Sequence, residues 1–146
     1  PEVEFKIVGT QDNSLDAIPI EEVKSWSEYV DYEGPTKDVR PYIKKCHVYV
    51  LPSYHEGLPR STLEAMSMGR PILTTNASGC KETVDENING FLVPIGSSQE
   101  LAKRMIWFIN NRDKINSMGE HSRKIIEKRF DVRKVNKEML KILEIN

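Results

Sequence analysis

The sequence predicts an α/β fold, with a mostly parallel, twisted sheet and helices on both of its faces. Two observations predict it. Short apolar runs, most of which end at glycine or proline, alternate with segments of helical periodicity, which is typical of parallel sheets covered on both sides. The length of 146 residues also suits one domain over residues 1–146, which is long enough to bury a core without disulfide bonds or metal ions.

The first elements are two short strands with a helix between them. Residues 3–8 form an apolar run that ends at Gly9, which predicts a strand. A short helix is predicted over 20–27 and a second strand over 29–32. Gly34 and Pro35 then end this second strand.

The middle of the chain predicts a helix, a buried strand and another helix. Val39 and Ile43 share one face of a helix predicted over 37–45. Residues 47–51 (HVYVL) are β-branched and aromatic and stop at a proline, which predicts a strand. A helix is then predicted over 61–68, with a glycine that would end it.

The last part of the chain predicts two strands followed only by helices. The strands are residues 71–75 (PILTT) and 90–94 (GFLVP). A first helix would begin at Ser97, where Glu100 three positions later suggests a capping box. The others are predicted over 112–129 and from Asp131 onward. The first and the last of these helices carry apolar stripes that are by default core faces: Leu101, Met105 and Phe108, and Val132, Val135 and Met139.

Composition narrows the classes of function. Lys and Arg number 21 and Asp and Glu 22, so no overall field attracts nucleic acid or an anionic membrane, and any anion site must be local. The two cysteines, Cys46 and Cys80, lack metal-ligand spacing. Because two cysteines do not make a disulfide scaffold, they favour a reducing compartment. No apolar run approaches the roughly 20 residues of a membrane span, and no signal peptide is recognisable. We expect a cytoplasmic protein.

In open parallel sheets, ligands bind outside the carboxyl ends of the strands. The loops to inspect therefore follow Val8, Leu51, Thr75 and Val93. The loop after Leu51 stands out, because it combines glycine, proline, a basic residue and two glutamates before the next helix begins.

The residues of this loop favour binding of an anion and of hydroxyl groups. Gly57 allows a close approach to a ligand or a positive φ, and Pro59 suits the first turn of a helix. The N–H groups at that helix end bind anions, and Arg60 adds a positive charge. Glu64, one turn inside the helix, has the two oxygens that adjacent ribose hydroxyls need, and Glu56 would reach the next sugar.

Glu56 and Glu64 form a Glu-x7-Glu arrangement that resembles the retaining GT-B glycosyltransferases of group 1, family 4 type, which build bacterial polysaccharides and glycolipids. The wording EGLPRSTLEAM-x-x-GRPI carries the resemblance. So do FKIVG near the start, YEGPTKDVRPYIKKCHVYVLPSY before the motif, SGCKETVDENINGFLVP after it and RF before the last helix. A bare Glu-x7-Glu is a weak signal, but embedded at these spacings it is specific.

The resemblance implies a Rossmann-like domain that binds a nucleotide sugar in a cleft between two such domains. Glu64 would hold the ribose hydroxyls, and Glu56 would contact the donor sugar near its reacting end. Backbone amides around Gly57, Leu58 and Pro59 would contact the sugar, and those at Ser61 and Thr62 would face the phosphates. The nucleotide base would lie near Pro35, Thr36, Lys37 and Asp38. Gly9, at the end of the first strand, is a further candidate for donor binding. No metal would be required, because the helix dipole and basic side chains replace it.

Parts of the family pattern are expected to precede Pro1. These are a first strand with an Arg and a Lys for the pyrophosphate, and an N-terminal acceptor domain with its usual His. We therefore expect a fragment of a two-domain enzyme that is inactive alone. UDP is the expected nucleotide, with GDP next, and the acceptor would be a saccharide or a lipid-linked molecule.

Simpler interpretations exist for several of these residues. Glu64 could close a capping box with Ser61, and Glu56 could be a solvated loop acid. His55 is not expected to act as a base, because the family's histidine belongs to the other domain. Cys80 is expected to be a small buried thiol. Two further histidines and one acid are expected to be structural: His47, His121 and Glu82.

A basic cluster lies near the C-terminus and consists of Arg123, Lys124, Lys128, Arg129, Arg133 and Lys134. A peripheral contact with a membrane is one interpretation, but interspersed acids favour a solvated helix face.

Three alternatives to the transferase remain open. They are a nucleotide-sugar epimerase of the same fold, a non-catalytic nucleotide-sugar-binding module, and a dimer formed through an exposed apolar face of the last helix, 132–143.

Overall fold

The computed structural model describes residues 3–11 and 17–143. The chain divides into two compact units, residues 1–42 and residues 43–146. Within the described ranges, no helix is both long enough and apolar enough to span a membrane.

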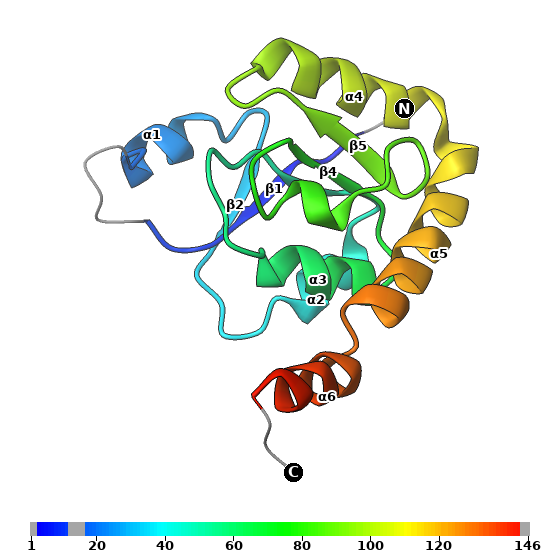
Figure 1. Ribbon diagram of the computed structural model, residues 1–146. Coiled ribbons are helices and arrows are strands. Elements are labelled where there is room, and N and C mark those ends of the chain that lie inside the picture. Colours follow the sequence, from blue (N-terminus) through cyan, green and yellow to red (C-terminus); the bar gives the residue numbers. More distant parts are fainter. Residues whose placement is uncertain (1–2, 12–16, 144–146) are drawn as a thin grey trace. The chain divides into compact units, whose positions relative to one another are not determined.

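The first unit contains a two-stranded parallel sheet. Strand β1 (Lys6–Val8) pairs with β2 (Asp31–Gly34), and helix α1 (Ile20–Ser25) lies between them in sequence (Figure 1). Strand β2 begins two residues later than predicted. Residues 26–30 instead form a turn after α1, in which the N–H groups of Tyr29 and Val30 donate to Trp26 O. Helix α2 (Arg40–Lys45) begins three residues later than predicted and crosses the boundary between the units.

The second unit contains a three-stranded parallel sheet in the order β3-β4-β5. The strands are β3 (Tyr49–Leu51), β4 (Ile72–Thr75) and β5 (Gly90–Val93). Its helices are α3 (Arg60–Ser67), the short 3-10 helix η1 (Lys81–Thr83), α4 (Ser98–Asn110), α5 (Arg112–Arg129) and α6 (Val132–Ile142).

The parallel pairing and the alternation of strands with helices confirm the predicted fold class. The strands nevertheless form two sheets where one continuous sheet was expected. The reason is that, among the described residues, β1 has a ladder partner only in β2, and β3 only in β4. A sheet continues only where another strand supplies the backbone donors and acceptors.

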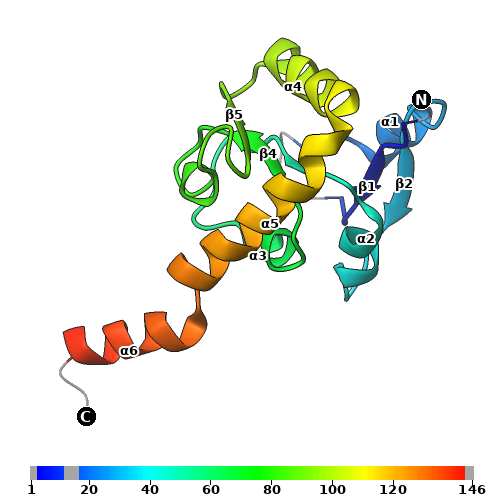
Figure 2. The ribbon, with the colours of Figure 1, turned by 90° about the vertical axis from the view of Figure 1, so that its right-hand side faces the viewer.

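Helices cover both faces of the three-stranded sheet. Figures 1 and 2 show α3 on one face and α4 on the other, with α5 running alongside α3. On the α4 face, Leu73, Phe91 and Phe108 are fully buried at the centre of the apolar core. Phe91 makes edge-to-face contacts with Trp107 and Phe108, with ring centroids 4.7 and 5.3 Å apart. This rigid core fixes the carboxyl ends of β3 and β4.

Helices α4 and α6 each begin after a residue whose side chain caps the helix. Ser97 caps α4 as predicted, and its Oγ accepts the Glu100 N–H at 3.4 Å. The Glu100 carboxylate does not complete the box, because it pairs with Lys103 at 2.5 Å. Asp131 caps α6, and its bonds with Arg133 lower the pKa of its carboxyl group to about 2.

Helix α6 has no buried residue, so the expectation that its apolar stripe is a core face is wrong, and the stripe is exposed, as the dimer alternative required. Val135 is 39% exposed, Met139 is 53% exposed and Ile142 is 78% exposed. The basic cluster forms a solvated face with ion pairs on three of its members. Arg123 pairs with Glu127, Arg129 with Asp85 and Arg133 with Asp131.

Candidate functional site

The loop between β3 and α3, residues 52–59, ends at Pro59, which is buried and caps the helix in an extended conformation. The Pro59 carbonyl accepts the N–H groups of Thr62 and Leu63 at 3.1 and 3.2 Å. Helix α3 therefore begins at Arg60, one residue before the predicted start. Proline needs no hydrogen-bond partner for its nitrogen, so it ends the loop without an unsatisfied donor.

The N-terminus of α3 carries no side-chain cap. Within the described ranges, the backbone N–H groups of Arg60 and Ser61 have no hydrogen-bond partner. The Arg60 side chain is exposed beside them. Unpaired amides at the positive end of a helix dipole form an anion-binding end.

Thr62 differs from the expectation that its amide is free for phosphate. Its N–H already donates to Pro59 O. Its side chain is fully buried, and its Oγ1 has no hydrogen-bond partner in the described part of the chain. The amides that this helix end offers are therefore those of Arg60 and Ser61.

The Glu64 side chain is exposed one turn into α3. The alternative that it closes a capping box with Ser61 is wrong, because Pro59 occupies the N-cap and no side chain caps the helix. Ser61 is the second residue of the helix rather than its cap, and its hydroxyl acts to lower the pKa of the nearby Tyr49 hydroxyl. The Glu64 carboxylate has no partner in the described residues and remains available for a ligand.

Tyr49, on β3, lies within electrostatic reach of both glutamates, although sequence analysis did not single it out. Burial raises the pKa of the Tyr49 hydroxyl above its usual value, and the negative charges of Glu56 and Glu64 act in the same direction. Both carboxylates therefore act on the same phenol. The only sequence signal for a role of Tyr49 was its place in a predicted strand, seven positions before Glu56.

Glu56 is half-buried and held by its own loop. Ser53 Oγ donates to Glu56 Oε1 at 2.9 Å. The Ser53 carbonyl in turn accepts the Thr75 hydroxyl at 2.5 Å, which ties the loop to the end of β4. Thr74 makes the corresponding bond to Leu51 O at 2.7 Å. A solvated loop acid would lack this support, so the geometry favours a fixed Glu56.

Gly57 distinguishes between the two reasons that the sequence offered for a glycine. Its φ lies outside the left-handed region, and a Cβ built on it would meet nothing within 4 Å. Neither strain nor crowding within the chain requires glycine here. The open side of Gly57 leaves room for another molecule close to the backbone. The next residue, Leu58, is 42% exposed.

In the first unit, the carboxyl ends of β1 and β2 meet at two glycines. The Gly9 N–H donates to Gly34 O at 3.0 Å, and the Tyr32 hydroxyl donates to Gly9 O at 2.8 Å. Gly34 has a φ of 76°, which turns the chain out of the strand. Gly9 and the segment that follows Gly34 thus lie at the same edge of this sheet.

The side chains of segment 35–38 are partly occupied. The Thr36 hydroxyl donates to Asp38 O at 2.9 Å, and the Asp38 N–H donates to Thr36 Oγ1 at 3.1 Å. The Asp38 carboxylate accepts the Arg40 N–H and pairs with its guanidinium, which lowers the pKa of Asp38. Pro35 and Lys37 are exposed. The Asp38 side chain therefore caps α2, and Lys37 is the exposed charge of this segment.

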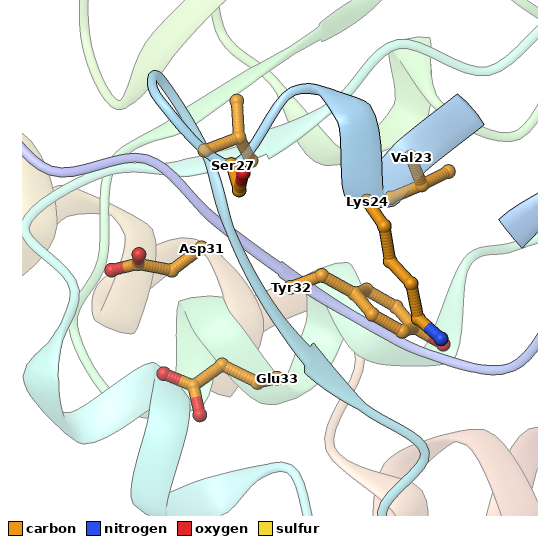
Figure 3. A pocket seen from close by; sticks show the side chains of 7 residues that line it. Val23, Lys24, Ser27, Asp31, Tyr32 and Glu33 are labelled. Carbon is orange, nitrogen blue, oxygen red and sulfur yellow. The ribbon is translucent and has the colours of Figure 1, made fainter. Parts of the chain in front are cut away.

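A surface hollow of about 500 Å³ also lies in the first unit, between α1 and β2. Figure 3 shows Lys24 extending toward the Tyr32 ring, whereas Asp31 and Glu33 point to the opposite side of the strand. These two acids pair with Lys6. None of the residues predicted to bind a donor lines this hollow.

The remaining candidates stay outside the site. Cys80 is fully buried, as predicted. The His55 side chain is exposed. His121 bonds the Ser117 carbonyl within α5. No three His, Cys, Asp or Glu side chains within residues 3–11 and 17–143 cluster as metal ligands.

Comparisons with known proteins agree with the family resemblance that the Glu-x7-Glu arrangement suggested. The family model for glycosyl transferases group 1 matches residues 1–111. An uncharacterized glycosyltransferase of Haemophilus influenzae is 31% identical over 144 residues, which cover 98% of this chain and 40% of the relative. An N,N'-diacetylbacillosaminyl-diphospho-undecaprenol alpha-1,3-N-acetylgalactosaminyltransferase of Campylobacter jejuni is 30% identical over 101 residues, 69% of this chain and 26% of the relative.

Solved structures show the same fold. Anabaena Alr3699/HepE in complex with UDP superposes with a TM-score of 0.87 at 27% identity, over 99% of this chain and 41% of that chain. Its complex with UDP-glucose gives a TM-score of 0.82 over the same shares. This chain thus spans about two fifths of the length of such relatives. The chain belongs to the glycosyl transferases group 1 family.

Proposed function

We propose that the chain is the donor-binding domain of a retaining glycosyltransferase, and that its donor is a UDP-sugar. The observation that carries the proposal is the arrangement around α3. Glu56 and Glu64 flank a helix end on which the amides of Arg60 and Ser61 are unpaired. Carboxylates suit sugar hydroxyls and the helix end suits a diphosphate, in the order in which a nucleotide sugar presents these groups.

The relatives support this choice of donor. HepE has been solved with UDP and with UDP-glucose. Since the chain spans only part of each relative, the transfer reaction would need a partner domain for the acceptor, which we propose is part of the same protein. We also propose a saccharide or lipid-linked acceptor at the cytoplasmic face of the membrane. The name of the Campylobacter relative, which acts on an undecaprenol-linked sugar, supports this acceptor class.

In the proposed reaction, the bond between the anomeric carbon of the sugar and the diphosphate breaks, and the oxygen of an acceptor hydroxyl bonds to the same carbon. The departing diphosphate gains negative charge and takes up the proton of that hydroxyl. The amides of Arg60 and Ser61 are already aimed by the fold, so they stabilise this charge without reorganisation. The Arg60 guanidinium adds a positive charge at the same end. We propose that these groups serve in place of a metal ion.

Titration calorimetry tests the proposal directly. The chain would be titrated with UDP, GDP, ADP and CMP, and then with UDP-glucose and UDP-N-acetylglucosamine. Binding of UDP in preference to the other three nucleotides is the expected result. Preference for GDP would correct the base but keep the donor role, and binding of none of the four at millimolar concentrations would contradict it.

Replacing Glu56 by alanine is expected to leave UDP affinity nearly unchanged and to weaken UDP-sugar binding about tenfold, because one charge-assisted hydrogen bond to the sugar is lost. Calorimetry with both ligands measures the ratio. Ser53→Ala is a graded companion, since it removes only the bond that holds Oε1. Equal losses for UDP and UDP-sugar in Glu56→Ala would place Glu56 away from the sugar.

Replacing Gly57 by alanine is expected to weaken UDP-sugar binding without loss of stability. The added methyl group meets nothing within 4 Å in the free chain and requires no unusual φ, so folding should be unaffected. It would occupy the space that we assign to the donor. Thermal unfolding and calorimetry together check this. Unchanged affinity in a stable variant would show that no ligand approaches this backbone.

A further inference from the structure

The turn after β4, residues 76–80, lies directly against the loop that carries Glu56. The Gly79 N–H donates to Glu56 O at 3.2 Å. A Cβ built on Gly79 would lie 1.4 Å from Gly57 O and 2.9 Å from Glu56 O, and real side chains do not approach a carbonyl so closely. Two backbone segments are therefore in contact, and only glycine at position 79 allows it.

This turn is the fixed member of the pair. Ala77 is 2% exposed and Cys80 is fully buried, so both ends of the turn are anchored in the core. The Asn76 N–H also donates to Val93 O at 2.9 Å. Gly57, in contrast, faces open space on the side where its own Cβ would lie. An extra atom at Gly79 would consequently displace the Glu56–Gly57 segment rather than the turn.

The contact also determines where the Gly57 amide points. The described peptide bonds are all trans, and in a trans peptide the C=O and the following N–H point in opposite directions. Because Glu56 O points at Gly79, the N–H of Gly57 points away from the turn. The Ser53 hydroxyl holds the Glu56 carboxylate at the same time. Backbone and side chain of Glu56 thus each have a separate support.

We propose that Gly79 is a positioning residue of the donor site, which aims the Gly57 N–H and the Glu56 carboxylate at the sugar of a UDP-sugar. This inference rests on the proposed donor-binding function and adds to it a residue that does not touch the donor. Gly79 acts through the 56–57 peptide, so its effect falls on the sugar and spares the nucleotide, which the N-terminus of α3 and Glu64 hold.

Gly79→Ala tests this role, with UDP-glucose and UDP as the two probes in calorimetry. Displacement of the loop is expected to weaken UDP-glucose binding about 10- to 100-fold, since misplacement by about 1 Å has effects of this size. UDP binding should change little. A ratio of the two affinities equal to that of the unsubstituted chain, in a folded variant, would overturn the proposal.

Gly90→Ala is the matched control. Its Cβ would lie 1.8 Å from Ile72 O, a comparable backbone clash, but at the amino ends of β4 and β5. We expect it to lower the thermal midpoint and to keep the ratio of UDP-glucose to UDP affinity. The same change of ratio in Gly90→Ala would show that general destabilisation explains the effect, and would overturn the role of Gly79.

A measurement without ligand separates this inference from the proposed function. In NMR spectra of the unsubstituted chain, the Gly79 amide should exchange with solvent more slowly than the Ser78 amide, whose residue is exposed. Gly79→Ala should shift the amide signals of Glu56 and Gly57, and Gly90→Ala should not. If the chain bound neither UDP nor UDP-glucose, the donor function would fail, while these signals would still decide whether Gly79 positions the loop. If Gly79→Ala did not fold, fast exchange of the Gly79 amide in the unsubstituted chain would overturn the contact and slow exchange would support it.

Discussion

Glu64→Ala is expected to weaken UDP binding about 10- to 100-fold, which corresponds to the loss of charge-assisted hydrogen bonds worth roughly 1.5–3 kcal/mol. The Glu64 carboxylate is exposed and has no partner in the described residues, so the chain itself makes no use of it. Alanine is the best helix former, so α3 should persist. Calorimetry with UDP, and circular dichroism for the fold, measure the two effects.

Glu120→Ala is the control for this prediction. Glu120 is an exposed glutamate within α5, next to Gly119, which lies against Gly69 after the C-terminal end of α3. Its loss changes the net charge by the same amount as the loss of Glu64. We expect unchanged UDP affinity. An equal loss in both variants would mean that overall charge, rather than a contact with ribose, accounts for the effect. Unchanged UDP affinity in a folded Glu64→Ala variant would contradict the contact between Glu64 and the ribose hydroxyls.

Phe91→Ala is expected to destabilise the second unit by about 3–5 kcal/mol, the usual cost of removing a buried aromatic ring and leaving a cavity. Phe91 is 1% exposed and touches the rings of Trp107 and Phe108. The Arg104 guanidinium also lies 4.3 Å from its ring centroid. Such a loss is a large part of the stability of a small domain.

Urea denaturation followed by Trp107 fluorescence measures this loss. A Trp26→Phe background leaves Trp107 as the only tryptophan of the 2 in the chain, so the signal reports on the second unit alone. Ile106→Ala, on the exposed side of α4 with 54% of its side chain accessible, should change stability by less than about 0.5 kcal/mol. Similar losses in both variants would contradict the placement of the core on the Phe91 side.

The sequence alone determined much of the fold and the place of the candidate site. Apolar runs ending at Gly or Pro located the strands, and α5 has the predicted bounds, 112–129. These signals are local, because periodicity and turn residues act on φ, ψ and burial within a few positions. The same locality explains the late start of β2, where the turn at Trp26 took residues that have strand propensity.

The tertiary structure decided which groups of the site are free and which are held. Pro59 rather than Ser61 occupies the N-cap of α3, so Glu64 closes no capping box and has no partner among the described residues. Ser53 holds the Glu56 carboxylate from within the loop, but the loop itself is held by Thr75 and Gly79, because parallel pairing brings the end of β4 beside the end of β3. Thr75 lies 22 positions after the Ser53 that it bonds. No local pattern encodes such a register. The sequence thus identified the candidate residues of the β3–α3 loop, and the packing of β3 against β4 determined that Thr75 and Gly79 hold this loop in place.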